Sequence, residues 1–258
     1  MGNLCGGGER EKTPRTGKSI KEHQAQTWQT QDLLNELRNS SATATVTRGT
    51  ARPPSPPSTT PTQSSPLPLW LTQSMTYMQQ EIDRAKALVD QGNENDAICK
   101  YQNVIDHVHE NIKINNVVDT PSPEFTSLMK FKARAYASIG YVYEHQLKFK
   151  VAVVQYKHAY SSAVSIDTST NHIDNFILLG RISENIGKVI FDKFHIYHAA
   201  EDKANAVKWI ETSEDWFHKS LHRSLSDDLS LDIHGHLEKL QKMKNTLMSF
   251  RCENLQKK

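Results

Sequence analysis

Histidine and cysteine are the side chains of this sequence whose types and spacing could hold a metal ion. The chain contains 12 His and 3 Cys. His218 and His222 are four residues apart, so on a helix both imidazoles would share one face and could bind Zn²⁺. A zinc site needs a third or fourth ligand, and no cysteine lies near this pair in the sequence. The same holds for the remaining pairs, His195 with His198 and His234 with His236. We therefore predict no metal and no cofactor.

Other signatures of catalysis are also missing from the sequence. There is no phosphate-binding GxxxxGK[ST] loop, no GxGxxG after a strand, no HExxH and no GxSxG. We predict that the protein is not an enzyme and has no small-molecule substrate, with a His-dependent metalloenzyme as a remote alternative. The formal net charge of +2 does not fit a strongly basic nucleic-acid-binding protein.

Gly2 and Cys5 could accept fatty acids. Removal of Met1 would leave Gly2 with the amine that N-myristoylation requires, and Cys5 lies close enough for palmitoylation. Gly6 departs from the preferred Ser or Thr of the myristoylation pattern. A single myristoyl chain binds membranes only marginally, so the second acyl chain would be needed for stable anchoring. We predict a lipid-anchored protein on the cytoplasmic face of a membrane, and otherwise a cytoplasmic one.

The cysteines also bear on the environment of the chain. Cys5, Cys99 and Cys252 are odd in number, widely spaced and form no CxxC pair. This usage favours a reducing, cytosolic compartment over a disulfide framework. We interpret Cys99 and Cys252 as small buried apolar side chains.

Proline and Ser/Thr usage divides the chain at about residue 68. Of the 10 prolines, only Pro121 and Pro123 follow that point. Residues 39–68 consist mainly of Ser, Thr, Pro and Ala, which cannot bury enough apolar surface to fold. We predict that residues 1–68 form a disordered lipid-anchor tail and linker, with a possible short amphipathic helix at 19–38, and that residues 69–258 form a folded domain.

The pattern from Leu69 onward is typical of an all-α domain. Good helix formers dominate, and alternation of the strand type is absent. We predict helices at about 70–91, 94–115, 123–146, 149–166, 171–197, 200–224 and 227–255. Short connections between consecutive helices favour antiparallel hairpins. The last segment carries Ile233, Leu240 and Leu247 at heptad spacing and is interpreted as a C-terminal capping helix.

Small and aromatic residues alternate in a specific order along these hairpins. Gly140 follows Tyr136 and precedes Tyr143, and the next segment carries small residues on either side of Tyr156. This order resembles the tetratricopeptide repeat (TPR), although Val164 replaces the late proline of the signature, and Glu81 and Arg84 replace apolar residues in the first hairpin. About three such units are needed to bury a continuous core. The repeat signature positions are Ala97, Tyr101, Tyr136, Gly140, Tyr143, Ala152, Tyr156, Ala159 and Gly180.

The TPR resemblance implies a partner-binding groove lined by the first helix of each pair. Transferring the family's groove positions selects Lys86, Tyr141 and Arg181. The asparagine that some members use to clamp a terminal carboxylate is missing, which favours an amphipathic helix or mixed peptide as ligand. We predict a non-catalytic, membrane-tethered adaptor or scaffold that binds protein partners. The first hairpin alone also resembles the microtubule-interacting-and-trafficking (MIT) domain, which implies the alternative of a soluble trafficking or cytoskeletal binding module.

Overall fold

Seven helices make up most of the residues that the structure describes. The computed structural model describes residues 67–117, 122–166, 173–223 and 226–250. Within these ranges the protein is all-α, as predicted from the sequence, and the helix boundaries agree with the predicted ones to within six residues. The predicted helix at 19–38, Gly2, Cys5 and Cys252 lie outside the described residues. The helices are α2 (Leu69–Asp90), α3 (Glu94–Ile114), α4 (Pro123–His145), α5 (Phe149–Val164), α6 (Ile173–Tyr197), α7 (Ala200–Leu221) and α8 (Asp227–Ser249).

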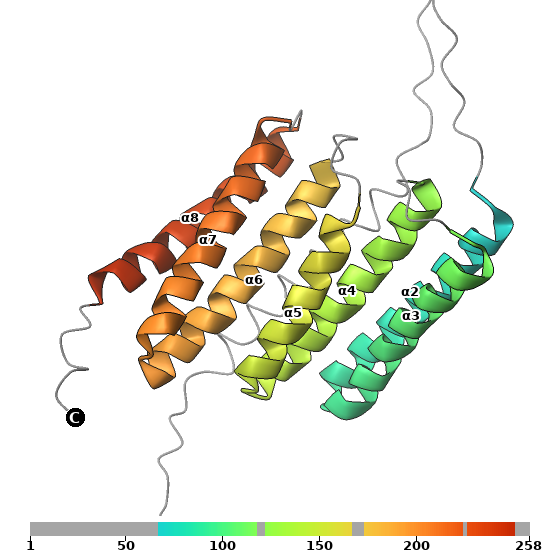
Figure 1. The fold of residues 1–258 in the computed structure, drawn as a ribbon, viewed down its shortest axis with the longest axis horizontal. Coiled ribbons are helices and arrows are strands. Elements are labelled where there is room, and N and C mark those ends of the chain that lie inside the picture. The colour runs from blue at the N-terminus through green and yellow to red at the C-terminus, as the bar shows by residue number, and fades with distance from the viewer. Residues whose placement is uncertain (1–66, 118–121, 167–172, 224–225, 251–258) are drawn as a thin grey trace, which may run out of the picture. The chain divides into compact units, whose positions relative to one another are not determined.

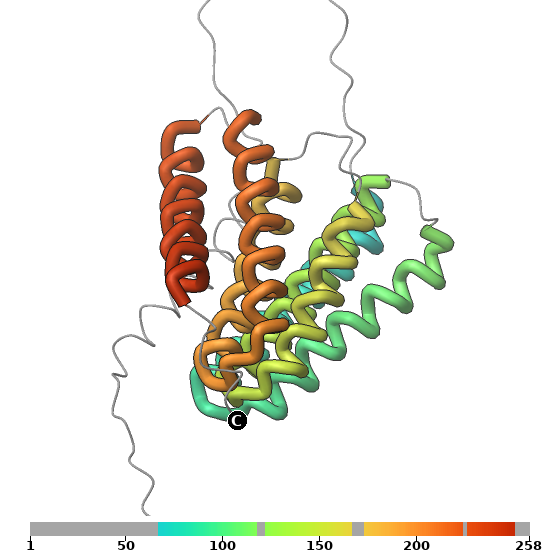
Figure 2. The backbone as a smooth tube through the Cα atoms, turned by 60° about the vertical axis from the view of Figure 1, so that its left-hand side comes forward, coloured from blue at the N-terminus to red at the C-terminus, as the bar shows by residue number. Residues whose placement is uncertain are grey.

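Consecutive helices pack against one another along the array (Figure 1). α2 packs on α3, α4 on α5 and α6 on α7, and each pair contacts the next through α3 with α4 and α5 with α6. First helices of neighbouring pairs also touch, since α2 contacts α4. α8 packs on α7 and reaches α6, and Figure 2 shows it beside α7. This arrangement brings side chains of α6 and α8 together.

The turns inside the first two pairs have the same geometry. Gly92 (φ 78°) and Leu147 (φ 57°) both adopt the left-handed conformation that ends many helices. In each turn the N–H of this residue donates to the carbonyl three residues back, at 2.9 Å in both cases. The next N–H donates to the carbonyl five residues back, at 2.8 and 2.9 Å. These bonds satisfy helix carbonyls that would otherwise lack partners.

Local sequence also explains where α4 begins. The Ser122 side chain accepts a hydrogen bond from the backbone N–H of Phe125 at 3.0 Å, and Pro123 occupies the first helical position. Serine at the cap and proline at the first position are both favoured at helix starts. Pro123, the second proline of the TPSP stretch, is therefore the first residue of α4.

Close helix contacts depend on small residues within the pairs. A Cβ atom added at Gly140 would lie 3.0 Å from the ring of Tyr156, and one at Gly180 would lie 2.9 Å from the ring of Phe217. The core around these contacts contains fully buried alanines, including Ala97, Ala152 and Ala159. The heptad row of α8, namely Ile233, Leu240 and Leu247, is also fully buried.

Glycine-to-alanine substitution should have opposite effects at Gly180 and Gly235. Gly180→Ala places a methyl group against Phe217, and overpacking of this kind lowers the free energy of unfolding by about 1–3 kcal/mol. Gly235 lies inside α8 with no atom within 4 Å of an added Cβ. Gly235→Ala should therefore raise stability by about 0.5–1 kcal/mol through helix propensity. Urea unfolding followed by circular dichroism measures both, and a Gly180→Ala protein as stable as wild type would contradict this packing.

Candidate functional site

The predicted repeat signature residues lie at the helix interfaces. Tyr101 and Tyr156 are 3% and 1% exposed, whereas Tyr136 and Tyr143 are half-buried beside the core. The Tyr156 hydroxyl donates to Glu144 at 3.0 Å, which ties α5 to the end of α4. Burial and the Glu144 charge raise the pKa of Tyr156 well above its usual value. These residues contribute to the packing within and between the helix pairs.

Two of the three predicted groove residues occupy the α2 and α4 helices with partly accessible side chains. Lys86 on α2 has a 23% exposed side chain whose ammonium lies 3.8 Å from Asp83. Tyr141 on α4 is half-buried, with its ring centroid 4.2 Å from that of His145. Tyr141 also contributes to the electrostatic environment of the buried Tyr101 phenol. The role of both residues in partner binding stays a prediction.

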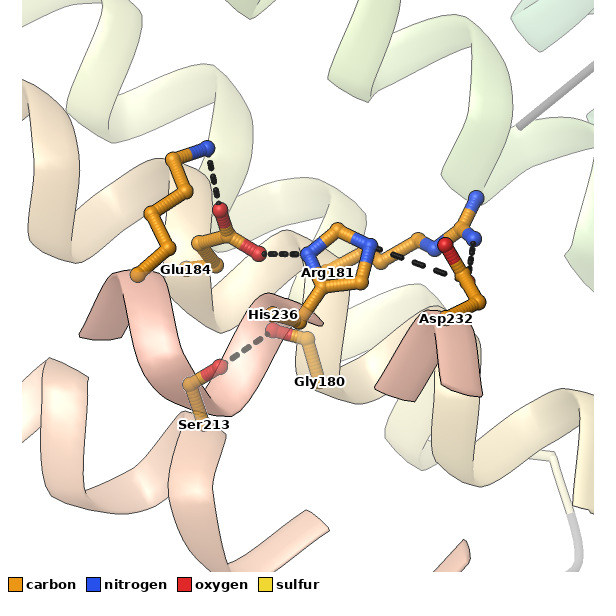
Figure 3. Close-up of polar contacts among 7 residues, drawn as sticks. Gly180, Arg181, Glu184, Ser213, Asp232 and His236 are labelled. Carbon is orange, nitrogen blue, oxygen red and sulfur yellow. Dashed lines mark hydrogen bonds and ion pairs between the residues drawn. The ribbon is translucent and has the colours of Figure 1, made fainter. Parts of the chain in front are cut away.

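Arg181, the third predicted groove residue, is enclosed within the protein. Its side chain is only 5% exposed, and its Nη2 donates to Asp232 of α8 at 2.7 Å (Figure 3). A guanidinium that already pairs with α8 contributes to the internal α6–α8 contact. The sequence predicted that Arg181 lies on the first helix of its pair, but it did not show that α8 packs against this helix and pairs with Arg181.

Glu184 is the centre of the polar contact between α6 and α8 (Figure 3). It is 3% exposed and accepts hydrogen bonds from His236 Nδ1 and Lys239 Nζ, both at 2.6 Å. Burial opposes ionisation of Glu184, but the bonds and charges of His236 and Lys239 outweigh it and lower the pKa of Glu184 to about 2. The second His236 nitrogen lies 3.8 Å from Asp232. We call Arg181, Glu184, Asp232, His236 and Lys239 the α6–α8 seam.

The polar contacts continue from the seam toward α4. Lys188 of α6 donates to Glu144 at 2.7 Å, and this carboxylate raises the pKa of Lys188 although burial acts in the opposite direction. One turn farther along α6, burial raises the pKa of Asp192 to about 6, against the opposing charge of Lys188. Arg181, Glu184 and Lys188 of α6 thus all pair with charged side chains of the same chain.

Arg134 on α4 was not among the residues singled out from the sequence. Its Nε and Nη2 are buried and have no hydrogen-bond partner among the residues that the structure describes. Burial lowers the pKa of Arg134 to about 10, partly offset by Asp83 and the nearby Tyr101, so the guanidinium remains charged at neutral pH. Its Cζ lies 5.3 Å from the Phe131 ring. The sequence carries one signal for this residue, since Arg134 is the only charge between Lys132 and Glu144.

The histidine and cysteine side chains lie in different environments. Within the described ranges no group of three or more His, Cys, Asp or Glu side chains could hold a metal ion. His236 is paired with Glu184, and His195 and His198 lie against the ring of Phe250, at 5.6 Å between centroids in both cases. Cys99 is exposed, so its interpretation as a buried apolar residue was wrong. Its position on the outer side of α3 follows from the helix register, because Ala97 and Tyr101 take the inner side.

Glu81 explains how the first pair tolerates a departure from the repeat pattern. It is 2% exposed and pairs with Arg84 and with Lys100, the latter at 3.1 Å. Burial works against the charged form, but these two hydrogen bonds lower the pKa of Glu81 overall. A paired carboxylate therefore contributes to the contact between α2 and α3.

Comparison with known proteins gives little beyond this geometry. No protein-family model matches the sequence, and no curated protein matches it. Among solved structures, the chain is similar to the yeast histone chaperone Hif1, described as a scaffold protein recruiting protein complexes to core histones. The identity is 9%, the TM-score is 0.39, and the match covers 70% of this chain and 98% of that one. A likeness of this degree assigns no function.

The candidate binding site is therefore described from the side chains of this protein and not from a relative. None of the described helices has the length and apolar character needed to span a bilayer. The α2–α4 junction, which we define as Lys86, Arg134 and Tyr141, combines two cations with an aromatic ring. It differs from the α6–α8 seam, where Arg181 already has a carboxylate partner.

Proposed function

We propose that this protein is a non-catalytic adaptor that binds a protein or peptide partner at the α2–α4 junction of a TPR-like helical array. The observation that carries the proposal is the contrast between two arginines on first helices of pairs. Arg181 pairs with Asp232 through Nη2 and has only its Nε buried without a hydrogen-bond partner, whereas neither Nε nor Nη2 of Arg134 has a hydrogen-bond partner among the described residues. The α6 end of the array is therefore closed by α8, and the α2–α4 end keeps binding capacity.

An amphipathic helix or short mixed peptide fits this junction best. Tyr141 provides apolar ring surface on α4, Arg134 provides positive charge on the same helix, and Lys86 provides positive charge on α2, which contacts α4. A partner segment with apolar residues and an acidic residue at helical spacing would match both features. The paired charges of the seam would reject such a segment, since binding there would first have to break internal ion pairs.

We further propose that the adaptor is held at the cytoplasmic face of a membrane through acyl chains on Gly2 and Cys5. The support is the local MGNLC sequence, in which an acceptor glycine and a cysteine lie three residues apart. The folded array would then present its binding junction near that membrane. This part of the proposal is independent of the junction and is tested separately.

Partner binding should depend on Lys86 and Tyr141. Full-length wild type, Lys86→Glu, Tyr141→Ala and the control Lys208→Glu serve as baits for partners identified by mass spectrometry. Lys208 is an exposed residue of α7, so its reversal changes net charge equally without altering the junction. We expect the junction variants to lose roughly tenfold or more of the binding of a partner that the control retains, consistent with about 1.4 kcal/mol or more at a binding hot spot. Equal retention by all variants would contradict the proposed junction.

Two alternatives give different results in simple measurements. A soluble MIT-like trafficking module would bind partners through the first pair alone, and its binding would survive substitutions on α4 such as Tyr141→Ala. A His-dependent metalloenzyme would carry stoichiometric zinc when purified without added metal. Neither alternative is favoured by a particular contact in the structure.

A further inference from the structure

Arg134 has an unsatisfied hydrogen-bonding edge in an otherwise apolar part of α4. The atoms without partners are Nε and Nη2, which are the two donors on the same side edge of a guanidinium. Ala133 and Ala135 beside it are fully buried, and Phe131 is 8% exposed. Both donors of one edge are therefore held in an environment that offers them no acceptor.

The nearest carboxylate does not supply that acceptor. Asp83 influences the charge of Arg134 at longer range but forms no ion pair with it within 4 Å. The Asp83 carboxylate instead accepts a hydrogen bond from Gln79 at 2.9 Å and lies 3.8 Å from Lys86. The buried phenol of Tyr101 is also close, and a phenol cannot neutralise a cation at neutral pH.

Arg181 shows how an arginine in the same fold obtains a carboxylate partner, although its own Nε is buried without a hydrogen-bond partner among the described residues. It lies on the first helix of its pair, as Arg134 does, and Asp232 accepts its Nη2 hydrogen bond at 2.7 Å. That acceptor comes from α8, the next helix to pack on α6. For Arg134 the corresponding carboxylate is not supplied by any described residue.

We propose that Arg134 is a carboxylate-binding residue whose Nε and Nη2 edge takes up an acidic group of the partner in a bidentate hydrogen-bonded pair. This inference rests on the proposed function and specifies the chemistry of the same junction. A planar carboxylate has two oxygens with the spacing that a guanidinium edge requires, which a single-point acceptor lacks. The carboxylate comes from an Asp or Glu side chain or from a chain terminus.

Two features of Arg134 favour uptake of an anion. An unpaired buried cation is unfavourable in the free protein, so pairing with a carboxylate removes a cost already present before binding. Other atoms of Arg134 are partly exposed although Nε and Nη2 are buried, so the side chain has to rotate to present this edge to an incoming group. Lys86 adds positive charge on the neighbouring α2, which attracts anions to the same place.

The side-chain Nε–H resonance of Arg134 in ¹⁵N-labelled full-length protein tests this inference directly. The resonance is assigned by its loss in Arg134→Lys, and the exposed Arg84 serves as the internal reference. The probes are N-acetylglutamate α-amide, which carries only a side-chain carboxylate, and N-acetylglycine, which carries only a main-chain one. Sodium chloride at equal ionic strength is the control. We expect a saturable shift of the Arg134 resonance with at least one carboxylate, and the more effective probe identifies the source.

A matched substitution separates binding from folding. Arg134→Met removes the charge and keeps a long apolar side chain, so the protein should fold with undiminished stability. Carboxylates should raise the melting temperature of wild type in a saturable way and leave that of Arg134→Met unchanged beyond the chloride effect. Equal responses of wild type and Arg134→Met, or an Arg134 resonance that follows ionic strength alone, would overturn the inference. Loss of partner binding in Lys86→Glu and Tyr141→Ala would then still support the junction itself.

Discussion

Replacing Glu184 by glutamine is expected to lower the free energy of unfolding by about 3 kcal/mol at neutral pH. The pKa of Glu184 in the folded protein is about 2, against an ordinary value of 4.5. Each unit of this difference corresponds to about 1.4 kcal/mol of preference for the charged form. Glutamine keeps the shape and one acceptor oxygen but removes the charge that Lys239 and His236 contact at 2.6 Å. Urea unfolding at neutral pH measures the loss.

The pH dependence of the same variant identifies the cause. A carboxylate with a depressed folded pKa stabilises the protein above its unfolded pKa, and this contribution is lost as the pH falls through the folded value. The stabilisation by Glu184 is therefore complete above about 4.5 and disappears toward about 2. Wild type should lose stability more steeply than Glu184→Gln in this window, so the two proteins converge at low pH. A difference between them that is independent of pH would assign the effect to packing.

Glu238→Gln is the matched control for this experiment. Glu238 lies on α8 and contacts Lys242 at 2.6 Å, and that hydrogen bond also lowers the pKa of Glu238. Its side chain is 69% exposed, where water screens the interaction. The control should change stability very little at any pH. A loss equal to that of Glu184→Gln would show that burial in the seam is not what makes Glu184 important.

The helices were predictable because each relies on local information. Pro123 after Ser122 starts α4, and Gly92 adopts the left-handed conformation in the turn between α2 and α3. The Gly140 and Tyr156 contact was also visible in the sequence, since a small and a large residue recur at fixed positions in consecutive helices. Leu147, with a positive φ value, was less predictable, because leucine does not favour that conformation.

The chemistry of the site was harder to predict because it depends on contacts between distant helices. Arg181 and Asp232 are 51 residues apart, and no local pattern links them. Lys86 and Tyr141 could be selected from their positions in the repeat pattern. That Arg134 Nε and Nη2 lack a described hydrogen-bond partner becomes visible only when α2, α3 and α4 are packed together. Helical periodicity gives the register of a residue on its own helix, and the partner helix decides whether its charge is satisfied.

Membrane attachment should be lost when Gly2 is replaced by alanine. Gly2→Ala removes the residue whose amine we propose as the myristate acceptor, and on this proposal the protein should move from the membrane fraction to the soluble one. Fractionation of cells expressing full-length wild type and Gly2→Ala measures the change. Gly235→Ala, which makes the same chemical change on the exposed side of α8, is the control and should fractionate as wild type does.

Replacing Cys5 by serine should give an intermediate result that tests the need for two acyl chains. Each buried CH₂ group contributes about 0.8 kcal/mol, so the loss of a palmitoyl chain would remove on the order of 10 kcal/mol of membrane affinity. Cys5→Ser would keep the myristoyl chain and bind only weakly and reversibly, with an association constant on the order of 10⁴ M⁻¹. Metabolic labelling with alkyne analogues of the two fatty acids should show myristate on Cys5→Ser and neither label on Gly2→Ala. Identical partitioning of wild type, Gly2→Ala and Cys5→Ser would instead show that neither residue anchors the protein, leaving partner binding at the α2–α4 junction to operate without a lipid tether.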